Sequence, residues 1–447
     1  MELTGTALID HLQFLIAGVE GQTARGLLQF LAGLSPRLWG QVRASALLPD
    51  MIAACSRRPL DLAMLVYLCT ESPATISSVT SACILPCLSV LSGEINAVEL
   101  DSQPGSSAPS SQVRRRRKRL RDESESNGIQ PIIRLPETCQ LAHSRPSLLM
   151  GHSLSRATCD PNFAQMLYNH FEFLPVIRQL INTDFQDSLR NHYMAFRLHK
   201  CLSILENISS LEGSPGHKKS DLMQCLLPWL DQVLALECEM WINDEADHAL
   251  LQSVCCALRA LTNLTNGDAN TCAALRSAKG IKTAIRVIQL CESAVVRSSA
   301  ACDLITIAVA LLTNCAEVDQ TAQRLLCGEP VLTDLFQGVS QFWQVAVDTE
   351  HPESEQMVHC RTVAGYVSLL ISVLYLGCSG QREALSRSCS IPMVADILDQ
   401  FAILTKLGHP EQTQMIDEIT RIHRRLVSCI GMCELSKSSS CSPASVT

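Results

Sequence analysis

Apolar side chains recur every three or four residues along most of the chain, which predicts amphipathic helices. The first such stripe runs from Leu8 to Val19, and a second runs from Leu27 to Leu34. Ser35-Pro36 follows directly, and a serine before a proline is typical of the start of a helix. No repeat of fixed length is visible, but the alternation of helices and tight turns is typical of HEAT and armadillo units. We therefore predict an all-α, HEAT/armadillo-like helical-repeat solenoid with a disordered insertion.

Changes in this pattern divide the chain into four segments. Residues 1–92 are predicted to form N-terminal helical repeats. In residues 93–160 the apolar periodicity is lost and Ser, Pro, Gly and charged residues dominate, which predicts a disordered, basic and Ser-rich insertion. Longer helices are expected in residues 161–434, as C-terminal helical repeats. The serine-rich residues 435–447 are predicted to be a flexible tail.

The composition supports a helical protein. Hydrophobic residues make up 47% of the chain but aromatic residues only 4%, so Ala, Leu, Val and Ile must provide the packing. This favours stacked helices over sandwiches or barrels. Charged residues are 18%, below the usual share of about 25%, so much of the surface is expected to be buried in the fold or on a partner. The net charge of −8 argues against direct, sequence-specific nucleic-acid binding by the folded part.

Neither a membrane span nor a secretory signal is expected. The longest apolar run, Val363 to Cys378, is shorter than the roughly 20 residues that cross a bilayer and contains Tyr366 and Ser368. It is better interpreted as a buried core helix. Residues Met1 to Gly18 lack the basic start of a signal peptide.

The 22 cysteines lie inside apolar helical patterns and form no Cys-x-x-Cys pair. Cys83/Cys87 and Cys429/Cys433 are four residues apart, but no histidine pair near them would complete a zinc site. We expect reduced cysteines that act as small hydrophobic residues, with no metal and no cofactor.

A basic cluster within the predicted insertion indicates nuclear import. Clusters of this kind in exposed linkers are typical import signals. The acidic, serine-containing stretch Asp122 to Ser126 follows it, and its phosphorylation would modulate import. A solvated charge run or a weak nucleic-acid tether remains the alternative. The cluster consists of Arg114, Arg115, Arg116, Arg117, Lys118, Arg119 and Arg121.

No catalytic constellation is visible in the sequence. Gly213 to Ser220 lacks the Gly-Lys-Ser/Thr junction of a phosphate-binding loop, and Gly377-Cys-Ser-Gly380 has the wrong spacing for a nucleophile elbow. His192 and His199 lie two helical turns apart without a paired carboxylate. We therefore predict a protein that is not an enzyme.

Four stretches in the second half carry a family resemblance. They are His199-Lys-Cys-Leu-Ser-Ile-Leu-Glu206, Ala257-Leu-Arg-Ala-Leu-Thr-Asn-Leu-Thr-Asn-Gly-Asp268, Ile307-Ala-Val-Ala-Leu-Leu-Thr-Asn-Cys-Ala-Glu317 and Met357-Val-His-Cys-Arg-Thr-Val-Ala-Gly-Tyr-Val-Ser-Leu-Leu370. In this order and spacing they resemble the carboxy-terminal HEAT-repeat domain of the Wapl (wings apart-like) family of cohesin-release factors. The first half is similar to the early repeats of the family only loosely, through Asp61 to Leu68.

The resemblance implies an adaptor in the nucleus, associated with chromatin. Members of the family bind the cohesin ring together with the Pds (precocious dissociation of sisters) regulator and promote release of cohesin. The expected partners are the SMC ATPase heads, the kleisin, the stromal-antigen subunit and Pds, and the ATPase belongs to cohesin. The alternative is a generic armadillo/HEAT scaffold or transport adaptor, although no regular Trp-x-x-x-Asn array supports an importin-like role.

The resemblance also suggests protein-binding residues. Met357, Val358 and Arg361 begin the last motif and are candidates for an exposed partner surface, although Met357 can equally be a core residue. The other candidates either contact a partner or brace adjacent repeats; they are Asn263, Asn266, Asp268 and Glu317. The chain contains no Phe-Gly-Phe motif, with which animal members of the family engage Pds, so any contact with Pds must use other surfaces.

Overall fold

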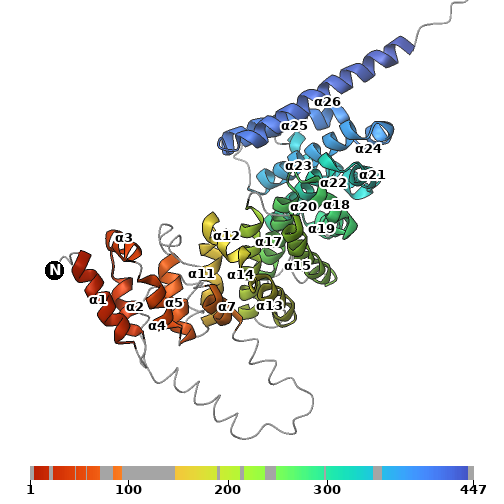
Figure 1. The fold of residues 1–447 in the computed structure, drawn as a ribbon. Coiled ribbons are helices and arrows are strands. Elements are labelled where there is room, and N and C mark those ends of the chain that lie inside the picture. The colour runs from red at the N-terminus through yellow and green to blue at the C-terminus, as the bar shows by residue number, and fades with distance from the viewer. Residues whose placement is uncertain are drawn as a thin grey trace, which may run out of the picture. The chain divides into compact units, whose positions relative to one another are not determined.

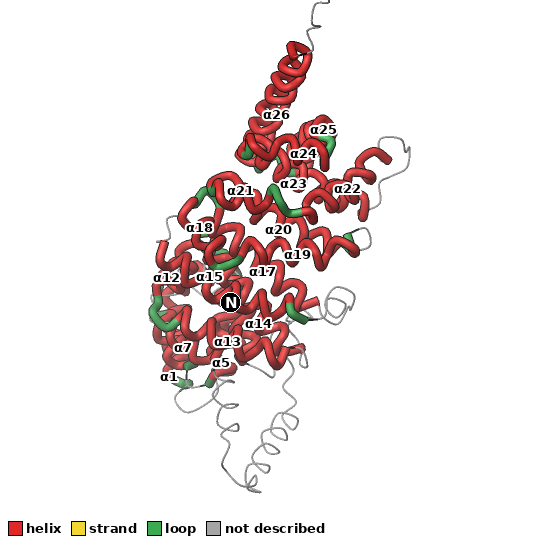
Figure 2. The backbone as a smooth tube through the Cα atoms, turned by 90° about the vertical axis from the view of Figure 1, so that its right-hand side faces the viewer, coloured by secondary structure: helices red, strands yellow, loops and turns green. Residues whose placement is uncertain are grey.

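In the computed structural model, the described residues form helices and the turns that join them, and no strand occurs among them (Figure 1, Figure 2). The chain divides into two compact units, Met1–Glu212 and Gly213–Thr447. The described residues are 5–19, 24–45, 47–56, 58–70, 84–92, 146–188, 192–211, 216–236, 248–295, 298–345 and 355–440. The basic cluster at 114–121 lies outside them.

Unit 1 is a stack of helices in which α5 packs on α11 and α11 packs on α14. The expected helix start at Ser35 is present, because Ser35 Oγ accepts a hydrogen bond from the Leu38 N–H at 3.4 Å. The helices of unit 1 are α1 (Gly5–Ala17), α2 (Arg25–Ala32), α3 (Pro36–Ala44), α4 (Leu48–Cys55), α5 (Pro59–Thr70), α7 (Ile84–Ser92), α11 (Pro146–Ala157), α12 (Pro161–Asn169), α13 (Phe173–Ser188) and α14 (His192–Ser209).

Helix α11 corrects the predicted insertion, which was drawn too long at its C-terminal end. Residues 146–157 are helical and largely buried, although the prediction placed them in a disordered segment. The serines of this helix made it look like a linker, but they are satisfied inside the fold. Ser153 Oγ donates to the Leu149 carbonyl at 2.8 Å, and Ser155 shares a 2.9 Å hydrogen bond with Ser203 of α14. The hydrogen bonds remove most of the cost of burying these hydroxyls.

A buried ion pair joins the helices of unit 1. Arg197 of α14 donates to both carboxylate oxygens of Asp184 of α13, at 2.8 and 2.6 Å, and both side chains are only 1% exposed. Its third contact is a 3.3 Å hydrogen bond to Ser147 Oγ of α11. The bidentate pair and the Ser147 contact together connect three helices. Removing either charged partner would leave the other charge buried and unpaired, which strongly destabilises a protein.

Unit 2 repeats a three-helix pattern of a short, an intermediate and a long helix. These triplets are α18–α19–α20, α21–α22–α23 and α24–α25–α26, and the long helix of each packs against the long helix of the next. This is the architecture of armadillo-type repeats and confirms the predicted fold class. The helices are α15 (Gly216–Leu234), α17 (His248–Thr265), α18 (Ala269–Ser277), α19 (Gly280–Cys291), η4 (Glu292–Ala294), α20 (Ser299–Val318), α21 (Gln320–Leu326), α22 (Pro330–Val345), α23 (Glu355–Gly377), η5 (Ser379–Gln381), α24 (Arg382–Ser388), α25 (Ile391–Gly408) and α26 (Thr413–Ser440).

The last helix is longer than the sequence suggested. Helix α26 continues to Ser440, whereas residues from 435 onward were predicted to be a flexible tail. Figure 1 shows the C-terminal end of α26 extending away from the other helices of unit 2.

The apolar character of the long helices is explained by their burial. Helices α20 and α23 are each long and apolar enough to cross a membrane, and the bent pair that ends in α25 passes the same test. The short apolar run from Val363 therefore did not exclude a span by length, because α23 begins before that run, at Glu355. However, 61% of the α20 segment and 67% of the α23 segment are buried inside the protein. Their apolar side chains therefore form the core between successive triplets.

Most cysteines that the structure describes are core residues of one of the two units. All are unbridged, and all except Cys159 and Cys327 are buried. Burial raises the pKa of the Cys55 thiol to about 12, and the nearby Asp61 carboxylate adds to this effect. A thiol with so high a pKa is almost entirely protonated at neutral pH, so it is a poor nucleophile and a poor metal ligand.

Candidate partner surface

Several of the predicted binding residues lie at the junction between the long helix α17 and the triplet that follows it. Helix α17 ends at Thr265, and Asp268 caps the N-terminus of α18 by accepting a hydrogen bond from the Thr271 N–H at 3.0 Å. The other carboxylate oxygen of Asp268 accepts from Lys219 Nζ of α15 at 2.7 Å. The Lys219 ammonium and the Thr271 N–H hold the pKa of the Asp268 carboxyl down at about 2.

The next triplet begins in the same way. Asp319 caps α21, accepting from the Thr321 N–H at 2.8 Å, and its second oxygen pairs with Arg276 Nε of α18 at 2.6 Å. Partial burial opposes ionisation of Asp319, but the Arg276 guanidinium and the capped N–H groups keep its pKa below the usual value. Each capping aspartate therefore also binds a basic side chain from a preceding helix. Sequence reasoning missed Asp319, Lys219 and Arg276, although an aspartate directly after each long helix was a usable signal.

Asparagines near the ends of the long helices brace adjacent repeats. Asn314 Nδ2 of α20 donates to the Thr262 carbonyl at 2.9 Å and to Thr265 Oγ1 at 3.3 Å, both on α17. In unit 1, Asn207 of α14 makes a similar pair of contacts, to the Ser155 carbonyl of α11 and to Oγ1 of Thr158, the residue after α11, both at 3.0 Å. Neither asparagine was among the predicted residues, although both occupy a Leu-x-Asn sequence near the end of a long helix.

The structure brings four of the predicted residues together at this end of the long helices. Asn263 and Asn266 lie exposed near the end of α17, next to the half-buried Asp268. Glu317 is exposed one turn beyond Asn314, which itself contacts α17. Partial shielding from water and the Glu418 carboxylate of α26 raise the pKa of Glu317, against the lowering effect of Arg421.

The other three predicted residues lie at the opposite end of the long helices. Cys360 Sγ, in the first turns of α23, lies 3.8 Å from the carbonyl oxygen of Val295, which precedes α20. Met357, Val358 and Arg361 therefore lie near the N-terminus of α20, whereas Glu317 is at its C-terminus. A helix of 20 residues is about 30 Å long, so the seven residues form two separate surfaces and not one site. Met357 is half-buried, and Val358 is 50% exposed.

The Asp268 ion pair predicts a specific loss of stability in acid. Because the folded-state pKa of about 2 lies below the ordinary 3.8, this group stabilises unit 2 fully above pH 3.8. We expect that contribution to disappear as the pH falls from about 4 to about 2. Asp268→Asn keeps a good helix cap but loses the charge, so its stability should change less over this range than that of the wild type.

Urea unfolding followed by far-UV circular dichroism at several pH values measures this difference. Asp303→Asn is the control, because Asp303 is an exposed residue of α20 that caps no helix. If Asp268→Asn and the wild type lose stability in parallel below pH 4, the Lys219–Asp268 pair does not contribute as proposed.

No metal centre is visible in the part of the chain that the structure describes, where no group of three or more His, Cys, Asp or Glu side chains converges. The chemistry that these two surfaces offer is exposed carboxylates and amides at one end and an apolar side chain beside a guanidinium at the other. Such groups suit binding to another macromolecule.

Solved structures similar to this chain are helical proteins with low sequence identity. An engineered protein of the Northeast Structural Genomics Consortium is 13% identical to this chain, and the match covers 63% of this chain and 91% of the engineered protein, with a TM-score of 0.38. The SYS-1/POP-1 complex is 11% identical, with 89% and 75% coverage and a TM-score of 0.37. SYS-1 alone is also 11% identical, with 96% and 88% coverage and a TM-score of 0.34. At these scores the fold assignment rests on the helix packing described above.

Comparison with curated proteins found no match. A family model does match, over residues 169–322, and its description is "Wings apart-like protein regulation of heterochromatin". The matched segment, about a third of the chain, includes three of the four motifs on which the resemblance was based. The role that this description names is the regulation of heterochromatin. Residues 169–322 are thus similar to the wings apart-like family, in agreement with the resemblance noted in the sequence.

Proposed function

We propose that this protein is a non-catalytic regulator of cohesin that binds the cohesin ring together with the Pds regulator and promotes release of the ring from chromatin. The observation that carries the proposal is the family match over residues 169–322. The architecture is consistent with it, because stacked triplets present long, rigid surfaces for binding. The partners would be the SMC ATPase heads, the kleisin, the stromal-antigen subunit and Pds, in the nucleus.

The surface at the start of α23 is the better candidate for the contact with cohesin. Val358 exposes half of its side chain, and Met357 beside it is flexible enough to adapt to a partner. Asp268 already has a structural role through Lys219 and the α18 cap, and Asn314 has one through α17. Asp268 and Asn314 therefore need no binding partner to explain them.

Affinity purification tests the proposal. The tagged full chain is isolated from nuclear extract, and the SMC, kleisin, stromal-antigen and Pds subunits are quantified by mass spectrometry. We expect all of them to be enriched, and we expect Met357→Glu and Val358→Glu to reduce recovery at least tenfold by placing a charge in the contact. Val427→Glu is the matched control, because Val427 of α26 is 48% exposed and lies far along the chain.

Release itself is measured as the residence time of fluorescent cohesin on chromatin. Removing the protein should lengthen that time, and only variants that still bind cohesin should restore it. Absence of cohesin subunits among abundant other partners would refute the proposal and favour a generic armadillo/HEAT scaffold or transport adaptor.

A further inference from the structure

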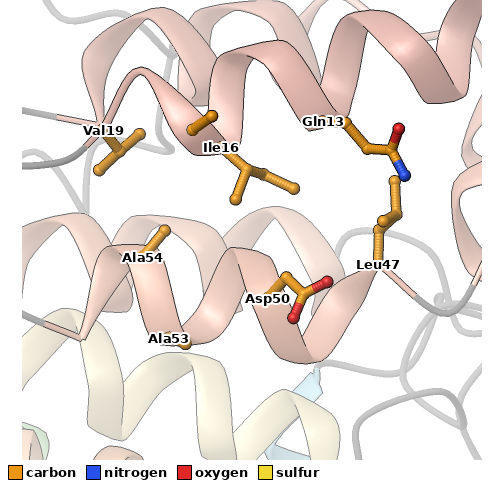
Figure 3. Close-up of a pocket in the computed structure, with 8 residues that line it drawn as sticks. Gln13, Ile16, Val19, Leu47, Asp50, Ala53 and Ala54 are labelled. Atoms are coloured by element: carbon orange, nitrogen blue, oxygen red, sulfur yellow. The ribbon is translucent and has the colours of Figure 1, made fainter.

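An open pocket of about 410 Å³ lies between the first and fourth helices of unit 1 (Figure 3). Helices α1 and α4 run side by side there, and their facing side chains leave the space between them unfilled. The lining residues are Gln13, Ile16, Ala17 and Val19 of α1 and the segment after it, together with Leu47, Asp50, Ala53 and Ala54 at the start and along the length of α4.

The chemistry of this pocket is uneven along its length. At one end are the aliphatic Ile16 and Val19 and the small side chains of α4. At the other end, Figure 3 shows the Gln13 amide and the Asp50 carboxylate gathered around Leu47. Asp50 lies in the first turn of α4, where a carboxylate suits the helix dipole, but neither Asp50 nor Gln13 has a hydrogen-bond partner among the described residues.

Helix α1 also carries an exposed aromatic side chain. Phe14 follows Gln13 on α1 and is 74% exposed, which is unusual for a phenylalanine. Asp10 lies one helical turn before Phe14 and also has no partner among the described residues. A pocket with aliphatic side chains at one end and the Asp50 carboxylate at the other, on a helix that also exposes an aromatic residue, has the composition of a binding surface.

We infer that the α1/α4 pocket is a docking site for an amphipathic helix of a partner protein, with aliphatic side chains one turn apart and a lysine or arginine beside them. Two side-by-side helices offer an elongated groove, and the small Ala17, Ala53 and Ala54 allow a third helix to approach closely. The carboxylates of Asp50 and Asp10 select the basic residue by charge complementarity. This binding activity goes beyond the proposed action on cohesin, which was assigned to unit 2.

A phage-displayed peptide library tests the inference. Every member carries two leucines four residues apart in an alanine-rich helical frame, with the flanking positions randomised, and the full chain is the bait. We expect the selected peptides to be enriched in Lys or Arg next to the leucines. Measured by fluorescence anisotropy, their affinity should fall at least tenfold for Ala53→Glu and Asp50→Lys and about two- to fivefold for Asp50→Asn.

Both changed positions are exposed, so the variants should fold; circular dichroism melting curves check this. Ala32→Glu places the same charge on an exposed position of α2 outside the pocket and should leave binding unchanged. Selection without basic enrichment, or affinities that Ala53→Glu does not alter, would overturn the inference. Two other results would also overturn it. If light scattering shows that the wild type is a dimer and that Ala53→Glu dissociates it, the pocket binds a second copy of the chain. If peptides bind only after residues 93–145 are deleted, the pocket binds that segment of the chain itself.

Discussion

Replacing Arg197 by methionine is expected to destabilise unit 1 by about 3–5 kcal/mol, the usual cost of leaving one partner of a buried ion pair uncompensated. The Asp184 carboxylate would remain 1% exposed and would lose its bidentate guanidinium. Ser147 Oγ of α11 would lose its donor as well. Urea unfolding measures the change, and hydrogen exchange in α11, α13 and α14 locates it.

Two further variants separate the charge effect from a packing effect. Asp184→Leu combined with Arg197→Met removes both charges and should recover most of the loss, because apolar side chains can replace a buried pair with little cost. Arg421→Met breaks the exposed Arg421–Glu418 pair of α26 and should cost no more than about 0.5 kcal/mol. If Arg197→Met alone and the double variant Asp184→Leu/Arg197→Met are equally unstable, the lost stability comes from packing and not from an unpaired charge.

Replacing Gly365 by alanine is expected to destabilise unit 2 by about 1–3 kcal/mol, the usual cost of overpacking a filled core. Gly365 lies inside α23 where that helix meets α25, and a Cβ atom there would lie closer than 3.0 Å to the Phe401 ring. The Phe401 ring cannot easily move, because it is buried and already packs against Tyr366, with ring centroids 5.2 Å apart. Alanine is the better helix former, so destabilisation would mean that packing outweighs helix propensity.

Gly338→Ala is the matched control, with an effect of opposite sign. Gly338 is also inside a helix, α22, but a Cβ atom there would meet nothing within 4 Å. This change should stabilise the protein by about 0.5–1 kcal/mol. Phe401→Leu should partly restore Gly365→Ala by making room for the methyl group. Equal effects of the two glycine substitutions on the thermal midpoint would contradict this account of Gly365.

The candidate surfaces could be predicted only in part. The order of the motifs led to the family whose model matches residues 169–322 and to residues at the ends of long helices. It could not show that Met357 and Glu317 lie at opposite ends of the same layer of helices. A motif gives separation along the chain, whereas the separation in space depends on which ends of α20 and α23 pack together.

The sequence by itself determined that the protein is helical, because the spacing of its apolar residues and its few aromatic residues allow little else. It also predicted that its cysteines are core residues, because they fall in the apolar stripes, and most of the described cysteines are buried. Only the tertiary structure showed that the serine-rich residues 146–157 are a buried helix, that Arg197 is neutralised inside unit 1, and that Asp268 and Asp319 each serve a cap and an ion pair. The physical reason is that a polar side chain can be buried only where a partner meets it. Those partners lie 13 to 52 residues away along the chain, so no local pattern announces them.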